Sequence, residues 1–284
     1  MILPSRCIQS TKKDALYPSY DAIVIGAGIA GLVCGSFLAK AGKKVLIIEQ
    51  HSIPGGYCTS FKRKGFVFDA AVHHIGGCGK WGIVGRCFKT LGIEMAFYPL
   101  DPMDHLIFPD VSIEIPADLD EYILRLQDQF PLEKSNIKNF FQEFIKLYRA
   151  TFNNEKSQII DKYKNMTYLD MLDNFFLNDE IKMVLSGQWG YIGLPPAQAS
   201  AIGMCQMMIN YLKDGAFFPV GGTQEFANAI FKKFIDLGGH SMLSCKAEKI
   251  LCNEKSAHGV ALQDGREISA KLVVSNIDAK QTFF

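Results

Sequence analysis

The fold is decided by residues 21–49, which read DAIVIGAGIAGLVCGSFLAKAGKKVLIIE. The apolar run at 22–25 predicts a strand, and the glycine-rich turn after it leads into an amphipathic helix that ends near residue 41. A second apolar run at 45–48 predicts another strand. A strand, a glycine-rich turn, a helix and a strand in this order form the βαβ unit of a dinucleotide-binding fold.

Four residues of this stretch carry the binding prediction. Gly26 permits a sharp turn out of the strand, Gly28 lets the backbone approach a pyrophosphate, and Gly31 lets the helix pack closely on the strand. The N-terminus of the helix offers unpaired N–H groups and the positive end of its dipole to phosphates. Glu49 ends the second strand, where its carboxylate can accept hydrogen bonds from ribose hydroxyls and would repel a 2′-phosphate. The motif therefore predicts a bound dinucleotide, but it does not separate NAD from FAD.

The residues that follow this acid narrow the prediction. Pro54-Gly55-Gly56 is followed by GFVFD at 65–69 and by VHHIG at 72–76. These motifs resemble the FAD-dependent phytoene desaturase, carotenoid isomerase and retinol saturase family, and they fit its retinol saturase-like branch best. The run SGQWGYIGLPPAQAS at 186–200 also resembles the same part of the retinol saturase-like proteins. One departure is Tyr57, because desaturases and amine oxidases usually have Arg after the glycine doublet.

The resemblance implies an α/β fold, with a Rossmann-like FAD-binding domain and an inserted α+β substrate domain. It also implies that FAD is the cofactor. In related flavoproteins a strand corresponding to residues 247–250 runs past the adenine, which makes Glu248 and Lys249 adenine-side candidates. The cofactor-binding residues that we expect are Gly26, Gly28, Gly31, Glu49, Gly55, Gly56, Glu248 and Lys249.

The domain organisation follows from the same resemblance. We expect a flexible tail at 1–19, an FAD-binding domain made of 20–85 and 217–284, and a partly helical substrate-binding or cap domain at 86–216. The resemblance runs from about residue 20 to the end of the chain without reaching the C-terminal half of the family. We therefore expect a truncated chain, or one fragment of a split protein whose missing half a second chain supplies.

Two apolar features of the predicted cap domain allow more than one interpretation. The segment 134–149 predicts a helix with aromatic residues on one stripe, which could pack in the core, line an apolar tunnel or lie on a membrane surface beside lysines. Met204, Met207 and Met208 recur at helical spacing. They could floor a pocket for a long hydrocarbon, or they could simply fill the core.

Composition excludes several classes of function. The net charge of +1 over 284 residues gives no reason to expect a nucleic-acid partner. Eight cysteines include no CxxC pair and no cluster at metal-ligand spacing, so we expect reduced thiols in an intracellular protein and no metal. No apolar run reaches the roughly 18 to 20 residues that span a bilayer. We expect a cytoplasmic or peripherally membrane-associated protein.

The candidate catalytic residues are His73 and His74, which lie in the region that the family places near the flavin ring. On a strand, adjacent side chains point to opposite faces, so we expect only one of the two to face the flavin. The function implied is a flavin-dependent oxidoreductase that acts on a polyisoprenoid, carotenoid or retinoid-like, by hydride transfer, saturation, desaturation or double-bond isomerisation. The alternative is a truncated or split-protein fragment that binds FAD without independent catalysis. A simple NAD-linked dehydrogenase is disfavoured, because it has no use for the glycine doublet and the FD strand.

Overall fold

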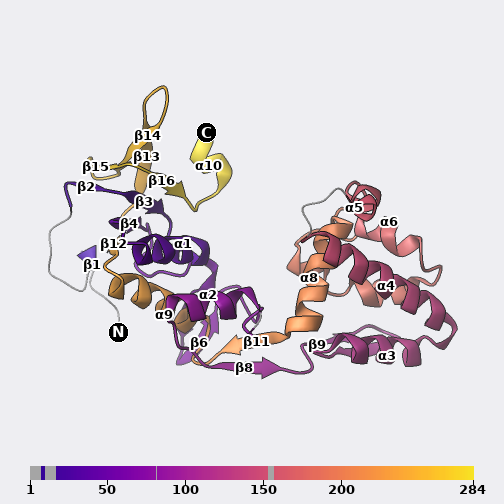
Figure 1. Ribbon diagram of the computed structural model, residues 1–284. Helices are drawn as coiled ribbons and strands as arrows, with labels where there is room; N and C mark the ends of the chain where they lie inside the picture. Colours follow the sequence, from indigo (N-terminus) through magenta and orange to yellow (C-terminus); the bar gives the residue numbers. More distant parts are fainter. Residues whose placement is uncertain (1–7, 10–16, 81, 153–156) are drawn as a thin grey trace. The chain divides into compact units, whose positions relative to one another are not determined.

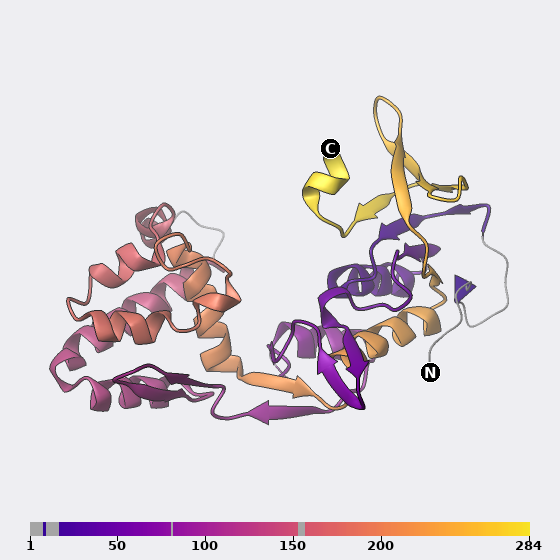
Figure 2. The same cartoon turned by 180° about the vertical axis from the view of Figure 1, so that it is seen from behind.

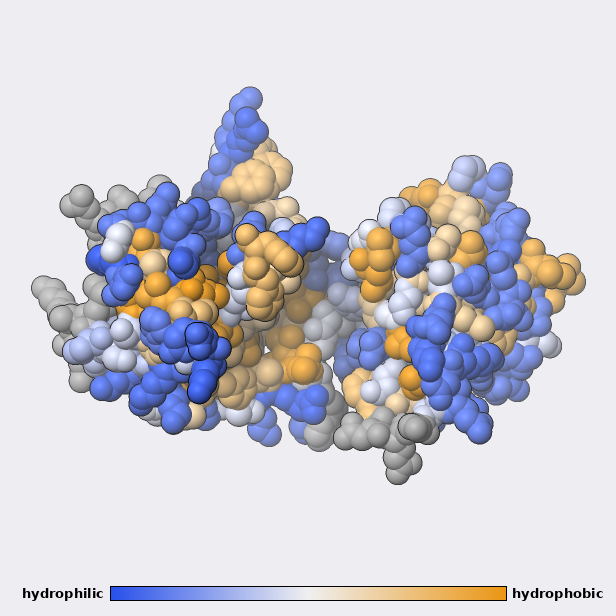
Figure 3. All heavy atoms as spheres, turned by 90° about the horizontal axis from the view of Figure 1, so that it is seen from above, coloured by the Kyte–Doolittle hydropathy of each residue, from blue (hydrophilic) through white to orange (hydrophobic). Residues whose placement is uncertain are grey.

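The computed structural model describes residues 8–9, 17–80, 82–152 and 157–284. The chain forms two compact units. Unit 1 contains the described residues up to Ile75 together with Gly85–Tyr98 and Phe218–Phe284, and unit 2 contains those of Gly76–Val84 and Pro99–Phe217 (Figure 1). Figure 3 shows hydrophilic side chains with hydrophobic patches between them on the visible face of each unit.

Unit 1 is built on a five-stranded sheet in the order β1-β12-β4-β3-β16. Strands β12, β4, β3 and β16 are parallel to one another. The edge strand β1 is antiparallel to β12. The bounds are β1 Ile8–Gln9, β3 Ala22–Ile25, β4 Val45–Ile48, β12 His240–Met242 and β16 Val273–Ser275. Every residue of β3 and β4 is buried, which confirms the two predicted strands and their place in the core.

Helix α1 (Ile29–Lys40) packs on this sheet and against α9 (Thr223–Asp236). The predicted helix is confirmed, but its expected amphipathic pattern is weak, because its buried face is mostly small. A Cβ atom added to Gly35 would lie 2.8 Å from the Ile47 side chain of β4. Small residues therefore allow α1 to approach the sheet closely.

Two smaller sheets belong to unit 1. One has four strands in the order β13-β14-β15-β2, and the other is the β5–β6 hairpin, which Figure 2 shows in violet. The bounds are β2 Ser19–Tyr20, β5 Ser60–Arg63, β6 Phe66–Asp69, β13 Ala247–Cys252, β14 Ala257–Leu262 and β15 Glu267–Ala270. The remaining elements that lie wholly in unit 1 are η1 Gly56–Cys58 and α10 Ala279–Phe283. Four elements contain residues of both units, namely β7 Ile75–Gly76, α2 Ile83–Leu91, β8 Phe97–Leu100 and β11 Ala216–Pro219. Strands β8 and β11 carry the chain across the boundary between the units.

Three predicted boundaries differ from the structure. The described residues of Gly76–Val84, which were expected in the FAD-binding domain, belong to unit 2. Residues 85–98 belong to unit 1 and not to the predicted cap, because Phe88 of α2 stacks on Phe226 of α9 with ring centroids 5.4 Å apart. The predicted flexible tail is anchored where it is described, since β1 pairs with β12 and the ring of Tyr17 stacks on His240. The rest of that predicted tail, residues 1–7 and 10–16, lies outside the described residues.

Unit 2 is mainly helical. Its elements are β9 Asp104–Ile107, β10 Ser112–Ile115, α3 Leu119–Gln129, η2 Pro131–Glu133, α4 Lys134–Ala150, α5 Gln158–Tyr163, α6 Tyr168–Asp173, α7 Asp179–Ser186, η3 Trp189–Tyr191 and α8 Ala201–Asp214. Helix α4 packs against α3, α5 and α8. Its aromatic stripe lies in the core of unit 2, with Phe140 and Phe144 fully buried. The core-packing interpretation of the stripe is therefore confirmed, and the membrane-surface interpretation of α4 is wrong.

The helix starts in unit 2 follow the capping residues. The side chains of Asp118, Thr167 and Asn178 accept hydrogen bonds from the first turns of α3, α6 and α7. Helix α8 begins at Ala201, because the Ser200 hydroxyl accepts a hydrogen bond from the Gly203 N–H and caps the helix there. No helix in the described part of the chain is long and apolar enough to cross a bilayer.

Candidate nucleotide site

Unit 1 contains a cavity of about 640 Å³ at the carboxyl ends of β3 and β4. Ligands of open parallel sheets bind at this edge, outside the carboxyl ends of the strands. The lining comes from the end of β3, the start of α1, the end of β4, the glycine doublet, the start of β13 and the segment after β16. The residues are Ile25, Gly26, Gly28, Ile29, Ala30, Ile48, Glu49, Gln50, His51, Gly55, Gly56, Tyr57, Cys58, Lys246, Ala247, Asn276, Ile277, Asp278 and Gln281.

Two positions of the glycine-rich turn require glycine for steric reasons. Gly26 has φ +98°, a conformation that residues with a Cβ rarely adopt, and it turns the chain out of β3. A Cβ atom on Gly31 would lie 2.2 Å from the carbonyl oxygen of Gly26. Gly31 does not line the cavity, but it lets α1 begin directly behind the turn.

The glycine doublet rests on this turn. The Gly55 N–H donates to the Ala27 carbonyl at 2.8 Å, and a Cβ on Gly56 would lie 3.1 Å from the Cα of Gly28. Both doublet residues have positive φ, +129° and +59°. The doublet therefore brings a second stretch of backbone against the turn, which explains why glycine follows glycine here.

Glu49 directly follows β4 and is buried, with 8% of its surface exposed. The Ala27 N–H donates to its Oε2 at 2.7 Å, and the His51 N–H donates to its Oε1 at 2.8 Å. A carboxylate has about four lone-pair sites, so each oxygen can still accept a ligand hydroxyl. Glu49 thus holds the glycine-rich turn in place and presents acceptors at the cavity wall.

The start of α1 suits a phosphate. Its N-cap residue Gly28 makes no side-chain cap, and its first turn has no acidic residue. The N–H groups of the first turn of a helix have no partner within the helix, and they favour an anion. Lys246 adds a cation to the lining, although its Nζ also pairs with Glu248 at 3.2 Å.

The segment after β16 was missed as part of the site. The Asn276 N–H donates to the Ile25 carbonyl at 2.8 Å, and its side-chain amide lies 2.9 Å from the position of a Gly31 Cβ. Asp278 and Gln281 follow it in the lining. The sequence shows a strand pattern followed by polar residues here, which does not by itself indicate a binding site. These residues reach the site only because the sheet order places β16 beside β3.

Glu248 and Lys249 do not line the 640 Å³ cavity. They line a neighbouring cavity of about 840 Å³ between β13, β16 and α10. The two cavities share four residues in their linings, Ile25, Ala247, Ile277 and Gln281. The adenine-side role of Glu248 and Lys249 stays a prediction.

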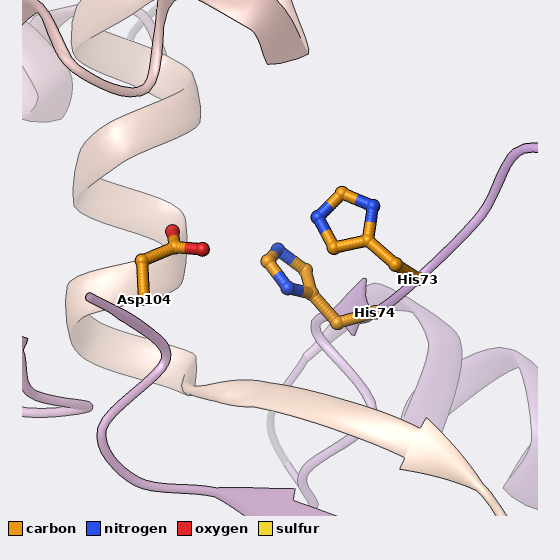
Figure 4. Close-up of side chains that lie close together, drawn as sticks. All are labelled: His73, His74 and Asp104. Carbon is orange, nitrogen blue, oxygen red and sulfur yellow. The ribbon is translucent and has the colours of Figure 1, made fainter. Parts of the chain in front are cut away.

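The two candidate catalytic histidines are in contact with each other. Their ring centroids are 4.4 Å apart in an edge arrangement, and Figure 4 shows both rings on the same side of the backbone. The expectation that they point to opposite faces is wrong, because residues 73–74 precede β7 and are not part of a strand. His74 is buried and His73 is exposed.

Asp69, the acid of the FD strand, ties the hairpin to α9. Its Oδ1 accepts hydrogen bonds from the Thr223 N–H at 3.2 Å and from the Thr223 hydroxyl at 2.8 Å. The Ser60 hydroxyl also donates to Asp69, and the Gln224 amide donates to the Pro54 carbonyl at 2.9 Å. The FD strand thus caps α9 and supports the loop that carries the glycine doublet.

The cysteines in the described part of the chain are all free thiols, as predicted. Cys58 lies in the cavity lining, where burial, together with the negative charge of Asp69, raises the pKa of its thiol. A raised pKa keeps this thiol protonated near neutral pH, so Cys58 is not an activated nucleophile.

Known proteins are similar to this chain, both in the region of the cavity and along most of its length. Residues 24–89 match a family model described as an NAD(P)-binding Rossmann-like domain. Prolycopene isomerase of Arabidopsis thaliana is 26% identical, over 97% of this chain and 50% of that protein. All-trans-retinol 13,14-reductase of Danio rerio is 28% identical, over 93% of this chain and 48% of that protein.

The chain is similar in sequence to the prolycopene isomerases and the all-trans-retinol 13,14-reductases. The predicted family resemblance is confirmed. An inactive all-trans-retinol 13,14-reductase of Danio rerio is also related, at 26% identity over 93% of this chain. The chain spans about half the length of the curated relatives it matches.

Solved structures show the same fold. A putrescine oxidase matches with a TM-score of 0.70 at 17% identity, over 93% of this chain and 60% of that one. An oxidoreductase from Methanosarcina mazei matches with a TM-score of 0.70 at 20% identity, over 90% of this chain and 58% of that one. The predicted α/β fold with a Rossmann-like domain is confirmed. The family model that matches residues 24–89 indicates a nucleotide cofactor.

Proposed function

We propose that this chain belongs to a flavin-dependent oxidoreductase that acts on a polyisoprenoid, carotenoid or retinoid-like. The observation that carries the proposal is the 640 Å³ cavity, because the glycine-rich turn, Glu49 and the glycine doublet all meet there. The relatives support the substrate class, since their names specify prolycopene and all-trans-retinol. The reaction is hydride transfer, saturation, desaturation or double-bond isomerisation.

FAD fits the residues of the cavity better than a nicotinamide dinucleotide does. The N-terminus of α1 would hold the pyrophosphate, and Glu49 would accept hydrogen bonds from the adenosine ribose. A simple NAD-binding domain does not need the Gly55-Gly56 doublet or the hydrogen bonds of Asp69 that support its loop. The bound flavin would supply the hydride chemistry, while the chain supplies binding and orientation.

The other expected roles stay part of the proposal. Unit 2 would contribute to binding the apolar substrate, and His73 and His74 would act near the reacting atoms. Met204 and Met208 are buried in the core of unit 2 and Met207 is half-buried, so core filling accounts for most of this group. We place the protein inside the cell, in the cytoplasm or on a membrane surface.

A second candidate function is FAD binding without independent catalysis. The support is that one relative is named an inactive all-trans-retinol 13,14-reductase. Strand β16 pairs with β3 on one side, and no other strand among the described residues pairs with its second side. We propose that a further polypeptide segment, supplied by a second chain, completes the sheet and the site there.

Reconstitution with FAD tests both candidates. The purified chain is incubated with FAD, separated from free flavin and examined by its visible spectrum. We expect bound FAD in the wild-type chain and none in the Gly31→Val variant. A folded but colourless wild-type chain would overturn both functions. If the reconstituted chain alone converts a carotenoid or retinoid, the oxidoreductase function is supported. If conversion requires a second polypeptide that corresponds to the relatives' C-terminal half, the function of an FAD-binding fragment is supported.

A further inference from the structure

The β5–β6 hairpin of unit 1 carries an unusual set of exposed aromatic residues. Phe61 is 51% exposed, Phe66 69% and Phe68 46%, and Val67 between them is 58% exposed. The hairpin is a two-stranded sheet of its own, with no third strand among the described residues. Large exposed apolar side chains that gather on one element mark an interaction site more often than scattered ones do.

The register places three of these rings on one face. Phe61 pairs with Phe68, and Arg63 pairs with Phe66. Side chains two apart on a strand share a face, so Phe61, Phe66 and Phe68 lie together with Arg63. The rings of Phe61 and Phe68 stack with centroids 5.4 Å apart, and those of Phe66 and Phe68 are 6.5 Å apart. The hairpin therefore presents a continuous aromatic strip.

The tip of the hairpin is basic. Lys62, Arg63 and Lys64 are consecutive and exposed, and residues 61–68 include no acid. Within the described part of the chain, none of these three cations forms an ion pair. Their charges are thus available to an anionic partner.

The hairpin has a fixed shape. Lys64 and Gly65 both have positive φ, +49° and +85°, which is the requirement of a two-residue type I′ turn. At the other end, the Asp69 contacts with Thr223 attach the base of the hairpin to the N-terminus of α9. The aromatic strip and the basic tip are therefore presented together by a rigid element.

We propose that the β5–β6 hairpin is a docking surface for an anionic lipid bilayer. Phenylalanine is among the apolar residues with which surface-bound elements enter the boundary between headgroups and acyl chains, and basic residues beside them are attracted to anionic headgroups. The charge of the tip selects a negative surface, and the strip of three phenylalanines provides the apolar side chains that enter it. The inference does not depend on the proposed reaction, but it would give an isoprenoid-handling protein access to a substrate dissolved in lipid.

Vesicle flotation without flavin or substrate tests the hairpin alone. The wild-type chain is mixed at physiological salt with phosphatidylcholine vesicles, with or without phosphatidylserine. We expect flotation with the anionic vesicles and little with phosphatidylcholine alone. The variants Phe66→Ser/Phe68→Ser and Lys62→Gln/Arg63→Gln/Lys64→Gln should each lower the partition coefficient by about ten-fold or more, because each removes one of the two attractions.

Matched controls come from other exposed positions. Leu132→Ser/Leu177→Ser removes two side chains that are 99% and 93% exposed in unit 2, and Lys134→Gln/Lys138→Gln/Lys255→Gln removes the same charge elsewhere. Both controls should bind within about two-fold of the wild type, with circular dichroism showing that all variants are folded. Failure of the wild type to float with anionic vesicles would overturn the proposal. Equal losses in the control and hairpin variants would overturn it as well.

A tryptophan at the strip gives a second measurement. In the Phe66→Trp variant, we expect brominated acyl chains to quench the new fluorescence when anionic vesicles are added. Vesicle binding without such quenching would show that another surface makes the contact, and it would contradict the proposal.

Discussion

The glycine-rich turn of unit 1 and the helical core of unit 2 use their residues in different ways. At the turn, residues are required for the space they leave, since a Gly31 Cβ would lie 2.2 Å from a backbone oxygen. In the core, residues are required for the space they fill, as with the fully buried Phe140 of α4. Many combinations of apolar residues fill a core, but only glycine leaves this turn intact. The turn therefore identifies a ligand class, whereas the core mainly determines stability.

The largest effect on stability should come from the core. Phe140→Ala removes a fully buried ring that contacts Phe141, Phe144, Phe175 and Phe176. We expect a loss of about 3 to 5 kcal/mol in the free energy of unfolding of unit 2. FAD affinity at 25 °C should not change, because the cavity lies in unit 1. Guanidinium unfolding measures the stability and an FAD titration measures the affinity, with Leu132→Ala as an exposed control. A parallel loss of FAD affinity would contradict the distinction between a core that determines stability and a turn that determines binding.

The turn should show the reverse pattern. Gly31→Ala forces a Cβ against the Gly26 carbonyl, and we expect a loss of about 1 to 3 kcal/mol in stability together with a loss of about a hundred-fold or more in FAD affinity. Gly203→Ala is the matched control, because its Cβ would meet nothing closer than 3.7 Å on helix α8. This control should stabilise the chain by about 0.5 to 1 kcal/mol. Equal stability and equal FAD affinity of the two variants would show that the close contact at Gly31 does not control FAD binding.

Substitutions of Glu49 test whether hydrogen bonds at the cavity wall contribute to FAD binding. Glu49→Gln keeps the size of the side chain, but its amide group must meet either the Ala27 or the His51 N–H as a second donor. We expect FAD affinity to fall by about ten- to a hundred-fold in Glu49→Gln and in Glu49→Ala. Fluorescence titration of flavin measures this, with the exposed Glu254→Gln as control. Unchanged FAD occupancy in both variants would contradict the assignment of Glu49 to the site.

A smaller effect concerns the thiol in the cavity. The raised pKa of Cys58 lowers its thiolate fraction at a given pH, and only the thiolate reacts with iodoacetamide. We expect Cys58 to react several-fold more slowly than the exposed Cys252 at pH 8, and its rate to rise as the pH increases toward the raised pKa. Asp69→Asn should speed the reaction, and bound FAD should slow it. Peptide mapping by mass spectrometry gives the two rates, and equal rates would contradict the burial of Cys58.

The sequence allowed the βαβ unit to be predicted because each of its signals is local. The apolar runs at 22–25 and 45–48 and the glycine spacing all lie within residues 21–49. The helix caps at Asp118 and Thr167 are local in the same sense, because each side chain accepts a hydrogen bond from the first turn of its own helix. These features need no knowledge of the rest of the chain.

Features that depend on distant parts of the chain were missed or wrong. Asn276 reaches the glycine-rich turn only because β16 lies beside β3, and sheet order cannot be inferred from the local pattern. The orientation of His73 and His74 was wrong because the expected strand begins only at Ile75. The family resemblance placed these segments near a cofactor, but it could not give their geometry.

Competition for the cavity tests the central claim most directly, namely that the described site of unit 1 binds the adenosine diphosphate half of FAD. Bound FAD is challenged with ADP or with FMN, and its displacement is followed by flavin fluorescence polarisation. We predict that ADP displaces FAD from the chain and that FMN, which lacks the adenosine half, does not. Displacement by FMN without displacement by ADP would contradict the assignment of the glycine-rich turn and Glu49.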